Sequence, residues 1–426
     1  MEVTKTYYSI NEVLKLYPKT LSLNINADTK ITPSIPVASP NLKWSGWEQS
    51  YKAAKQTLQY IDRLKTKVYI LIIENNQFKD FIKFNPRGEN LELKPYLRRL
   101  NKNIKWGKKE LYEIGKTKWK FMSCILQNRK EEDELERHPF HTPLQQLAEK
   151  YKLPNGMYIF SLRDVLLIHK KGFFPWTQVT GKIVKMINFP KSFLPIFNTT
   201  GGKYYRDIPI PNFEDRDYIF KNKPNLEGIN LAWESKVPTA VFRGGTSGCG
   251  YDEYTNPRIK IAKLSQILQE EKNEEIRSLL DAGVTKIPLK RKYRFDFKEG
   301  LGYFDNEMTQ IKPVKALNKV EQSNYKYIVY IEGNVAAHRL LVDMLLGSTI
   351  LYVDTEYKLW FEHLLVENVN YIKVKRDLSD LIQKILYCRE NDELCKNIAK
   401  NARELALSLL TKEIFINTFA NYIMNV

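Results

Sequence analysis

Several features that mark common protein classes are missing from this chain. It has four cysteines and five histidines among 426 residues, and no cysteine–histidine spacing fits a zinc site. The most apolar stretch, residues 340–353, is interrupted by Asp343, Gly347 and Ser348 and cannot span a membrane. The N-terminus lacks a basic segment followed by an apolar one, so we expect no signal peptide. Sparse cysteines and no transmembrane segment indicate a cytoplasmic protein of a reducing compartment.

The familiar phosphate-binding motifs are missing as well. Four glycines within residues 244–250 follow an apolar run, but no Gly-Lys-Ser/Thr forms a Walker loop. No Gly-x-Gly-x-x-Gly forms a dinucleotide fingerprint either. A glycine-rich turn can wrap an anion with backbone N–H groups, or it can be an ordinary loop, and the pattern alone leaves both open.

Positive charge and aromatic residues are abundant. The chain carries 67 basic and 49 acidic residues, a formal charge of +18. Such a field attracts nucleic acid, anionic membranes or nucleotides without choosing among them, and it also fits a solvated, lysine-rich surface. Because 43% of the residues are hydrophobic, the chain can form large cores, and disorder is excluded as its main state. Its length predicts two domains.

Short apolar segments that run into polar or glycine-rich residues indicate an α/β fold. The predicted strands are 68–73, 157–162, 193–197, 239–242, 328–331, 349–353 and 371–374. Helical segments near 392–410 and 412–424 close the chain. An open α/β sheet places its ligand at the carboxyl ends of its strands, so the loops after these strands are the candidate site.

The loop after the strand at 328–331 is the most informative of them. A turn at Gly333 and Asn334 leads into Val335, Ala336 and Ala337, then Arg339 and a helix. Small residues let a ligand approach the backbone, and arginine pairs with phosphate. The same pattern also fits plain helix packing with Arg339 on the surface.

Asp164 is a candidate general base. It follows the apolar strand at 157–162, beside Arg163. A carboxylate held there can take a proton from a hydroxyl group. A turn-former or a helix cap is the alternative interpretation of the same residue.

Three separated segments form one recognisable set. The first segment is Leu-Pro-Asn with a strand and an Asp at 153–164, and the second is Phe-Arg-Gly-Gly-Thr-Ser at 242–247 with Arg258. The third segment contains four motifs: Tyr-Lys-Tyr at 325–327, Gly-Asn-Val-Ala-Ala at 333–337 with Arg339, Trp-Phe at 360–361 and Tyr-Ile-Lys-Val-Lys-Arg-Asp-Leu-Ser at 371–379. This set resembles glycosyltransferase family 90, the capsule-associated-protein-like group that includes Rumi-type protein O-glucosyltransferases and xylosyltransferases. The similarity is continuous over about 320–425, patchy over 150–260 and absent before about 140.

The resemblance implies an α/β fold of the GT-B type, with two Rossmann-like domains facing a cleft. It implies an acceptor-side domain over residues 1–205 that carries Asp164. A UDP-sugar-binding domain would follow over 206–408, and a C-terminal helix over 409–426 would cross back to the N-terminal domain.

The resemblance also implies an activity. A sugar, glucose or xylose, would pass with inversion from a UDP-sugar to a hydroxyl of a protein or glycan acceptor, and Asp164 would be the catalytic base. The UDP-sugar would be held by Arg243, Gly244, Gly245, Arg258, Val335, Ala336, Ala337, Arg339, Asn198, Thr199 and Thr200. The UDP-sugar is a co-substrate, and no cofactor or metal is expected, because arginines and N–H groups can stabilise the departing diphosphate.

Two alternatives stay open. Asp215 and Asp217 form an Asp-x-Asp triplet, which would suit a metal-dependent glycosyltransferase. The second alternative is a non-catalytic basic binding or structural protein on the same fold, which would use its positive charge to bind nucleic acid. The presence of Asp164, Arg258 and Arg339 together does not favour nucleic acid as the partner. His338 and Gly245 depart from the family pattern. Gly245 stands at a position where the family usually has serine. A composition rich in Lys, Asn and Ile suits a viral source, and the location would then be the host cytoplasm.

Overall fold

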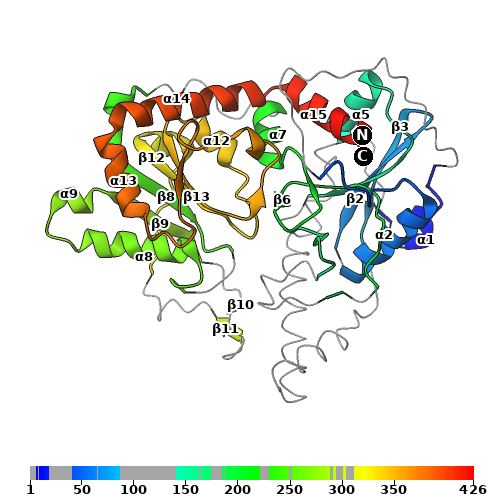
Figure 1. The fold of residues 1–426 in the computed structure, drawn as a ribbon, viewed down its shortest axis with the longest axis horizontal. Helices are drawn as coiled ribbons and strands as arrows, with labels where there is room; N and C mark the ends of the chain where they lie inside the picture. Colours follow the sequence, from blue (N-terminus) through cyan, green and yellow to red (C-terminus); the bar gives the residue numbers. More distant parts are fainter. Residues whose placement is uncertain are drawn as a thin grey trace. The chain divides into compact units, whose positions relative to one another are not determined.

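The computed structural model contains two compact units, each with its own β-sheet (Figure 1). Unit 1 comprises Met1–Thr177, Ile183–Pro211 and Glu413–Val426, and unit 2 comprises Gln178–Lys182 and Asn212–Lys412. The residues that the structure describes are 6–7, 9–18, 41–64, 66–86, 141–162, 165–173, 185–186, 188–220, 229, 231–248, 252–287, 291–293, 301–303 and 311–426. Asp164, the predicted base, lies outside them.

The described part of unit 1 holds a six-stranded mixed sheet in the order β1-β3-β2-β4-β5-β7. Its strands are β1 (Thr6–Tyr7), β2 (Val68–Glu74), β3 (Gln77–Phe84), β4 (Gly156–Ser161), β5 (Ile196–Asn198) and β7 (Ile208–Pro209). The short strand β6 (Gly201–Gly202) comes between β5 and β7 in the chain and is not part of this sheet. Strands β2 and β3 form an antiparallel hairpin, whose turn residues Asn75 and Asn76 both have positive φ. Asparagine tolerates this conformation, which two-residue hairpin turns require. Strand β4 then pairs in parallel with β5, and β5 with β7.

Helices cover the sheet of unit 1. They are α1 (Ile10–Leu14), α2 (Tyr51–Leu64), α5 (His141–Lys150) and the C-terminal α15 (Lys412–Met424). Within unit 1, Phe419 of α15 stacks on Phe160 of β4, and Tyr151 donates a hydrogen bond to Asn417 across 2.6 Å. Figure 1 shows α15 in red beside α5. The end of the chain therefore belongs to the core of the first unit.

The described part of unit 2 holds a five-stranded sheet in the order β15-β13-β12-β8-β9, in which every pairing is parallel. Its strands are β8 (Val237–Gly245), β9 (Leu280–Lys286), β12 (Tyr325–Tyr330), β13 (Thr349–Val353) and β15 (Ile372–Val374). The remaining short strands are β10 (Arg291–Tyr293), paired with β11 (Leu301–Tyr303), and β14 (Tyr357–Lys358). In chain order the main sheet reads 2-1-3-4-5, so the strand order reverses between β8 and β12.

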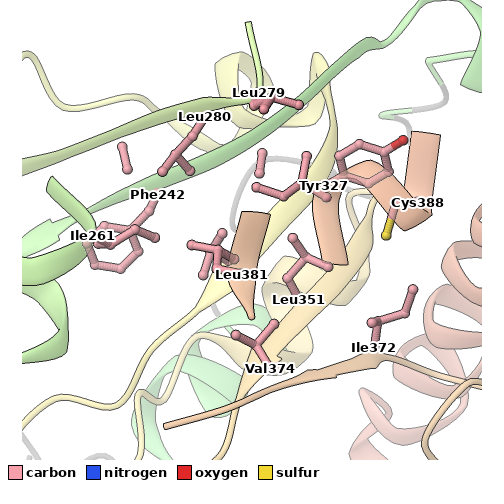
Figure 2. Close-up of a cluster of buried hydrophobic side chains, with 14 of the residues drawn as sticks. Phe242, Ile261, Leu279, Leu280, Tyr327, Leu351, Ile372, Val374, Leu381 and Cys388 are labelled. Atoms are coloured by element: carbon pink, nitrogen blue, oxygen red, sulfur yellow. The ribbon is translucent and has the colours of Figure 1, made fainter. Parts of the chain in front are cut away.

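Helices cover this parallel sheet as well. They are α7 (Phe213–Phe220), α8 (Pro257–Gln269), α9 (Glu274–Arg277), α11 (Lys319–Ser323), α12 (Leu340–Met344), α13 (Leu381–Glu390) and α14 (Asp392–Leu409), with 3-10 turns η3 (Trp233–Ser235) and η4 (Glu362–Leu364). Figure 2 shows Phe242, Tyr327 and Leu351 of neighbouring strands meeting Ile261 of α8 and Leu381 of α13. Almost unbroken apolar strands of this kind suit a parallel sheet with both faces covered.

The structure confirms the predicted α/β class. Each predicted strand falls on an observed one, although the strand expected at 193–197 is displaced to Ile196–Asn198. The sequence did not indicate β3, whose residues alternate between exposed and partly buried in its first half and are all buried in its second, and it did not indicate β9. In the described ranges, no helix combines the length and apolar character that crossing a membrane requires.

Candidate functional site

The main candidate site of unit 2 lies where the strand order reverses. There the carboxyl ends of β8 and β12 are neighbours in the sheet. Open α/β sheets bind ligands in the crevice outside such a point, because the connections from the two strands leave in opposite directions. The loops that follow are the Gly-Gly-Thr-Ser-Gly segment at 244–248 and the Gly-Asn-Val-Ala-Ala segment at 333–337. Two of the three recognised motifs therefore meet at one edge.

The two loops touch each other at Gly248. The backbone N–H of Gly248 donates to the side-chain oxygen of Asn334 across 3.1 Å. Gly248 has φ +102°, and a Cβ atom there would lie 3.0 Å from the carbonyl oxygen of Gly333. Only glycine fits both conditions without strain, so this position fixes how closely the loops approach.

Arg258 joins the same two loops from α8. Its Nε donates to the carbonyl of Glu332 across 2.7 Å, and its Nη2 to that of Ile331 across 3.0 Å. Its Nη1 donates to the carbonyl of Gly245 across 3.1 Å and to Ser247 Oγ across 2.7 Å. The side chain is almost fully buried. These bonds make Arg258 a clamp between the ends of β8 and β12.

The start of α8 explains the position of this arginine. Asn256 is the N-cap, and its side-chain oxygen accepts hydrogen bonds from the backbone N–H groups of Arg258 and Ile259. Pro257 occupies the first helical position, which suits its fixed φ. Asparagine followed by proline therefore begins the helix one residue before Arg258, which places the arginine in the first turn.

Arg339 is held differently. Its Nε donates to Asp343 across 2.9 Å, and the fully buried Asp343 also pairs with Lys319. Its guanidinium carbon lies 5.6 Å from the ring centre of Phe242, and that of Arg258 lies 5.8 Å from the same ring. The Nη1 and Nη2 groups of Arg339 donate to no residue that the structure describes. One edge of this guanidinium is thus anchored, and the other carries N–H groups for a ligand.

The Val-Ala-Ala segment at 335–337 is shaped through its carbonyl groups. Gly333 donates its N–H to the carbonyl of Val335 across 2.7 Å, and the Tyr330 hydroxyl donates to that of Ala337 across 2.8 Å. The N–H groups of the three residues make no hydrogen bond to the described parts of the chain. The turn therefore presents donors, which is the polarity an anion needs.

Arg243 is not part of this constellation. Its Nη2 and Nη1 donate to the carboxylate and the carbonyl of Asp281 on β9, across 2.7 and 2.8 Å, and Tyr325 donates to the same carboxylate. Because side chains alternate along a strand, Arg243 lies on the opposite face from Phe242. Its bonds hold β8 to β9. The structure thus brings together Gly244, Gly245, Arg258, residues 335–337 and Arg339, and separates Arg243 from them.

Thr246 is a further candidate, which the site predicted from the sequence did not include. Its side chain is completely buried beside Gly245, and its hydroxyl has no hydrogen-bond partner within the described residues. A buried hydroxyl without a partner is costly unless a ligand or water completes it. Its place inside the Phe-Arg-Gly-Gly-Thr-Ser motif was the available signal.

In unit 1, Asn198 is the last residue of β5, Thr199 and Thr200 follow it, and all three are buried. The Asn198 amide nitrogen donates to the carbonyl of Val165 across 2.7 Å, whereas its oxygen has no partner among the described residues. The hydroxyls of Thr199 and of Ser161 also have no hydrogen-bond partner among the described residues, and Ser161 is the last residue of the neighbouring strand β4. Buried, unpaired oxygens therefore collect at the carboxyl ends of β4 and β5.

Asp207 supports that edge, although no motif in the sequence indicated this residue. Its carboxylate accepts the backbone N–H groups of Leu167 and Ile168 across 2.8 and 2.9 Å, and the Asn198 amide across 3.0 Å. Complete burial raises the pKa of this carboxyl above its usual range, against the effect of these bonds. Asp207 thus fixes the segment that directly follows Asp164.

The Asp-x-Asp pair has structural roles. Asn212 caps α7, and Asp215, three residues on, accepts the N–H of Asn212 in return and the indole N–H of Trp360 across 2.9 Å. Burial raises the pKa of Asp215 to about 7. Asp217 pairs with Arg216. Searching the described residues for three metal-ligating side chains in one place finds no such group.

Comparison with known proteins gives the family. The model for Glycosyl transferase family 90 matches residues 144–424. This chain belongs to glycosyl transferase family 90. The matched range contains every predicted site residue, including Asp164, and all the residues of the two touching loops.

Relatives of this family 90 chain include viral and animal proteins. Uncharacterized protein 179R of Invertebrate iridescent virus 6 is 27% identical over 93% of this chain and 39% of its own length. Protein O-glucosyltransferase 3 of Homo sapiens is 27% identical over 62% of this chain and 45% of its own length. The chain thus spans less than half of either relative. HepE of Anabaena, solved with UDP-glucose, has a TM-score of 0.29 and 13% identity, covering 47% of this chain and 52% of that one.

Proposed function

We propose that this chain is an inverting glycosyltransferase that moves a sugar from a UDP-sugar to an acceptor hydroxyl without a metal ion. Family membership supports the reaction class. Relatives named protein O-glucosyltransferases support glucose, or a closely similar sugar such as xylose, as the transferred group and a protein as the acceptor.

The observation that carries the proposal is the pair of touching loops at the strand-order reversal in unit 2. Arg258 is occupied in holding them together, while Arg339 keeps two guanidinium nitrogens for a ligand. The unbonded N–H groups of residues 335–337 add further donors. Charge-assisted bonds from preorganised donors stabilise a diphosphate most strongly as it departs with extra negative charge.

The chemistry is a single displacement. The acceptor oxygen forms a bond to the anomeric carbon while the bond from that carbon to the diphosphate oxygen breaks, and UDP leaves with the electron pair. Asp164 takes the proton of the acceptor hydroxyl. One displacement inverts the anomeric centre and requires one base. Asp207 contributes by fixing residues 167 and 168, just after this base.

The metal-dependent alternative has less support. Asp215 completes a helix cap and accepts a bond from Trp360, and Asp217 pairs with Arg216, so each carboxylate already has a partner in unit 2. The charge that a metal would contribute to the departing diphosphate is instead assigned to Arg339.

The test is a UDP-release screen with UDP-glucose, UDP-xylose, UDP-galactose and UDP-GlcNAc, each with and without EDTA. We expect release from one of the first two donors at a rate that EDTA does not change. A rate abolished by EDTA and restored by Mn²⁺ would favour the Asp-x-Asp alternative. Absence of both UDP release and UDP binding, together with salt-sensitive binding of nucleic acid, would favour a non-catalytic basic protein.

A further inference from the structure

Unit 1 carries a compact basic surface that the proposed chemistry does not use. It consists of Lys170, Lys171, Lys203 and Tyr204, and we call it the lysine platform. All three lysines are exposed, and the Tyr204 side chain retains 44% of its accessible surface. The Lys203 ammonium lies 5.6 Å from the centre of the Tyr204 ring, so the aromatic ring and the cations form one continuous surface.

The platform is rigid, because its two turns are bonded to each other. The Lys170 N–H donates to the carbonyl of Tyr204 across 2.8 Å, and the Lys170 ammonium donates to that of Lys203 across 2.7 Å. Just beyond, Arg206 donates its N–H to the carbonyl of Ile168. These bonds hold the two turns together and fix the Lys170 ammonium, so a partner would not have to order the backbone of the platform on binding.

The charge of the platform is not neutralised within the described structure. None of its three lysines forms an ion pair with a carboxylate of the described residues. Partial burial and then the neighbouring Arg206 lower the pKa of Lys170. The pKa of His169 is lowered by burial and then by Lys171 and Lys170. Cations kept close together without a counter-charge suit an anionic partner.

The platform also lies where the chain leaves the candidate acceptor edge. Lys170 comes six residues after Asp164, and Lys203 comes three residues after Thr200, which follows β5. An acceptor whose hydroxyl reached the ends of β4 and β5 would have its flanking residues near these turns.

We propose that the lysine platform binds an acidic segment of the acceptor polypeptide, next to the hydroxyl that receives the sugar. This inference rests on the proposed function, in which the acceptor is a protein. Carboxylates of the acceptor would pair with the three ammonium groups, and the Tyr204 ring would cover an apolar side chain between them. A polypeptide is favoured over nucleic acid because the platform follows the candidate acceptor edge in the chain, and the proposed acceptor is a protein. Arg206, the nearby guanidinium, is stacked 5.2 Å from the Trp44 ring.

The test compares two triple variants of the full chain. One changes Lys170, Lys171 and Lys203 to Gln. The matched control changes Lys52, Lys55 and Lys152, three exposed lysines elsewhere in unit 1, to Gln. Binding of poly-L-glutamate is measured at several salt concentrations, and UDP binding is measured in parallel. We expect about tenfold weaker poly-L-glutamate binding and a shallower salt dependence in the platform variant, and little change in the control.

Each other outcome overturns the inference in a distinct way. Equal losses in both triple variants would mean that only the total charge matters. If a single-stranded DNA oligonucleotide bound more tightly than poly-L-glutamate, and if this binding were lost in the platform variant, the surface would be assigned to nucleic acid. If the wild-type protein binds UDP but does not bind poly-L-glutamate, the platform is rejected as a binding surface and the proposed function still stands.

Discussion

The Nε of Arg258 donates to the backbone carbonyl of Glu332 across 2.7 Å, and this bond joins the end of β12 to the helix that follows β8. Arg258 makes three further hydrogen bonds to the loops, whereas Arg339 uses only its Nε on Asp343. Two arginines with one expected role therefore separate into a clamp and a ligand-facing group.

Arg339→Lys should weaken UDP binding with little loss of stability. A lysine can keep a positive charge near Asp343 but loses the two guanidinium nitrogens that we propose bind the diphosphate. Losing one or two charge-assisted bonds predicts roughly tenfold weaker UDP binding by calorimetry. The melting temperature should stay near that of the wild type.

Arg258→Lys should mainly lower the stability of the protein, and weaker UDP binding should follow from that loss. Several carbonyl groups would lose their donor, and each buried, unpaired acceptor costs about 1–3 kcal/mol. We expect a free energy of unfolding lower by about 2–4 kcal/mol, measured by denaturant titration, with weaker UDP binding as a consequence. If Arg258→Lys weakened UDP binding without destabilising the protein, Arg258 would be a direct ligand and not a clamp.

Gly248→Ala should disturb the contact between the two loops. The new Cβ would meet the Gly333 carbonyl at 3.0 Å on a backbone with φ +102°. The matched control is Gly347→Ala, which has φ +62° but no atom closer than 3.9 Å to the new Cβ. Both variants should lose about 1–2 kcal/mol of stability through backbone strain, but only Gly248→Ala should lose UDP affinity. Equal UDP affinity in the two variants would contradict the site assignment.

Asp215 should make stability depend on pH. Because its pKa is raised to about 7, the folded protein holds a proton that the unfolded chain releases near pH 4. The contribution of Asp215 is therefore fully present below about pH 4 and is lost as the pH rises through about 7. Relative to Asp215→Asn, the wild type should lose up to about 1.4 kcal/mol of unfolding free energy per pH unit in this window.

The control for that experiment is the neighbouring Glu214→Gln, on the first turn of the same helix and partly exposed. Because the Glu214 charge is one of the smaller causes that raise the pKa of Asp215, this variant should keep most of the wild-type pH dependence of the unfolding free energy, with the loss moved slightly to lower pH. A wild type and an Asp215→Asn variant with parallel pH profiles would mean that Asp215 is ionised in the folded protein.

The sequence predicted four of the five strands of the main sheet in unit 2 because their apolar runs are nearly continuous, and it missed β9, whose sequence is interrupted by Asp281 and Gly283. The motifs that contain Gly248, Arg258 and Arg339 do lie together in unit 2. Arg243 was grouped with them, but its side chain is bonded to Asp281, and the pleat of a strand with a buried Phe242 already implies that the next side chain lies on the other face.

Other features could not be predicted because they depend on distant contacts. Nothing local distinguishes Asp207 from a surface aspartate, since its partners Leu167 and Ile168 are about 40 residues earlier in the chain. The division of work between Arg258 and Arg339 likewise depends on which backbone carbonyls lie within reach. Periodicity indicates which residues are buried, but it does not indicate which polar groups they meet.

The most direct test of the central claim is the sugar-transfer rate of Asp164→Asn, measured with the donor identified in the UDP-release screen and together with its affinity for UDP. Asparagine keeps the size of the side chain but cannot accept the proton of the acceptor hydroxyl. The account predicts a transfer rate lower by about 10²–10⁴-fold with UDP affinity unchanged. An Asp164→Asn variant that transfers sugar at the wild-type rate would contradict it.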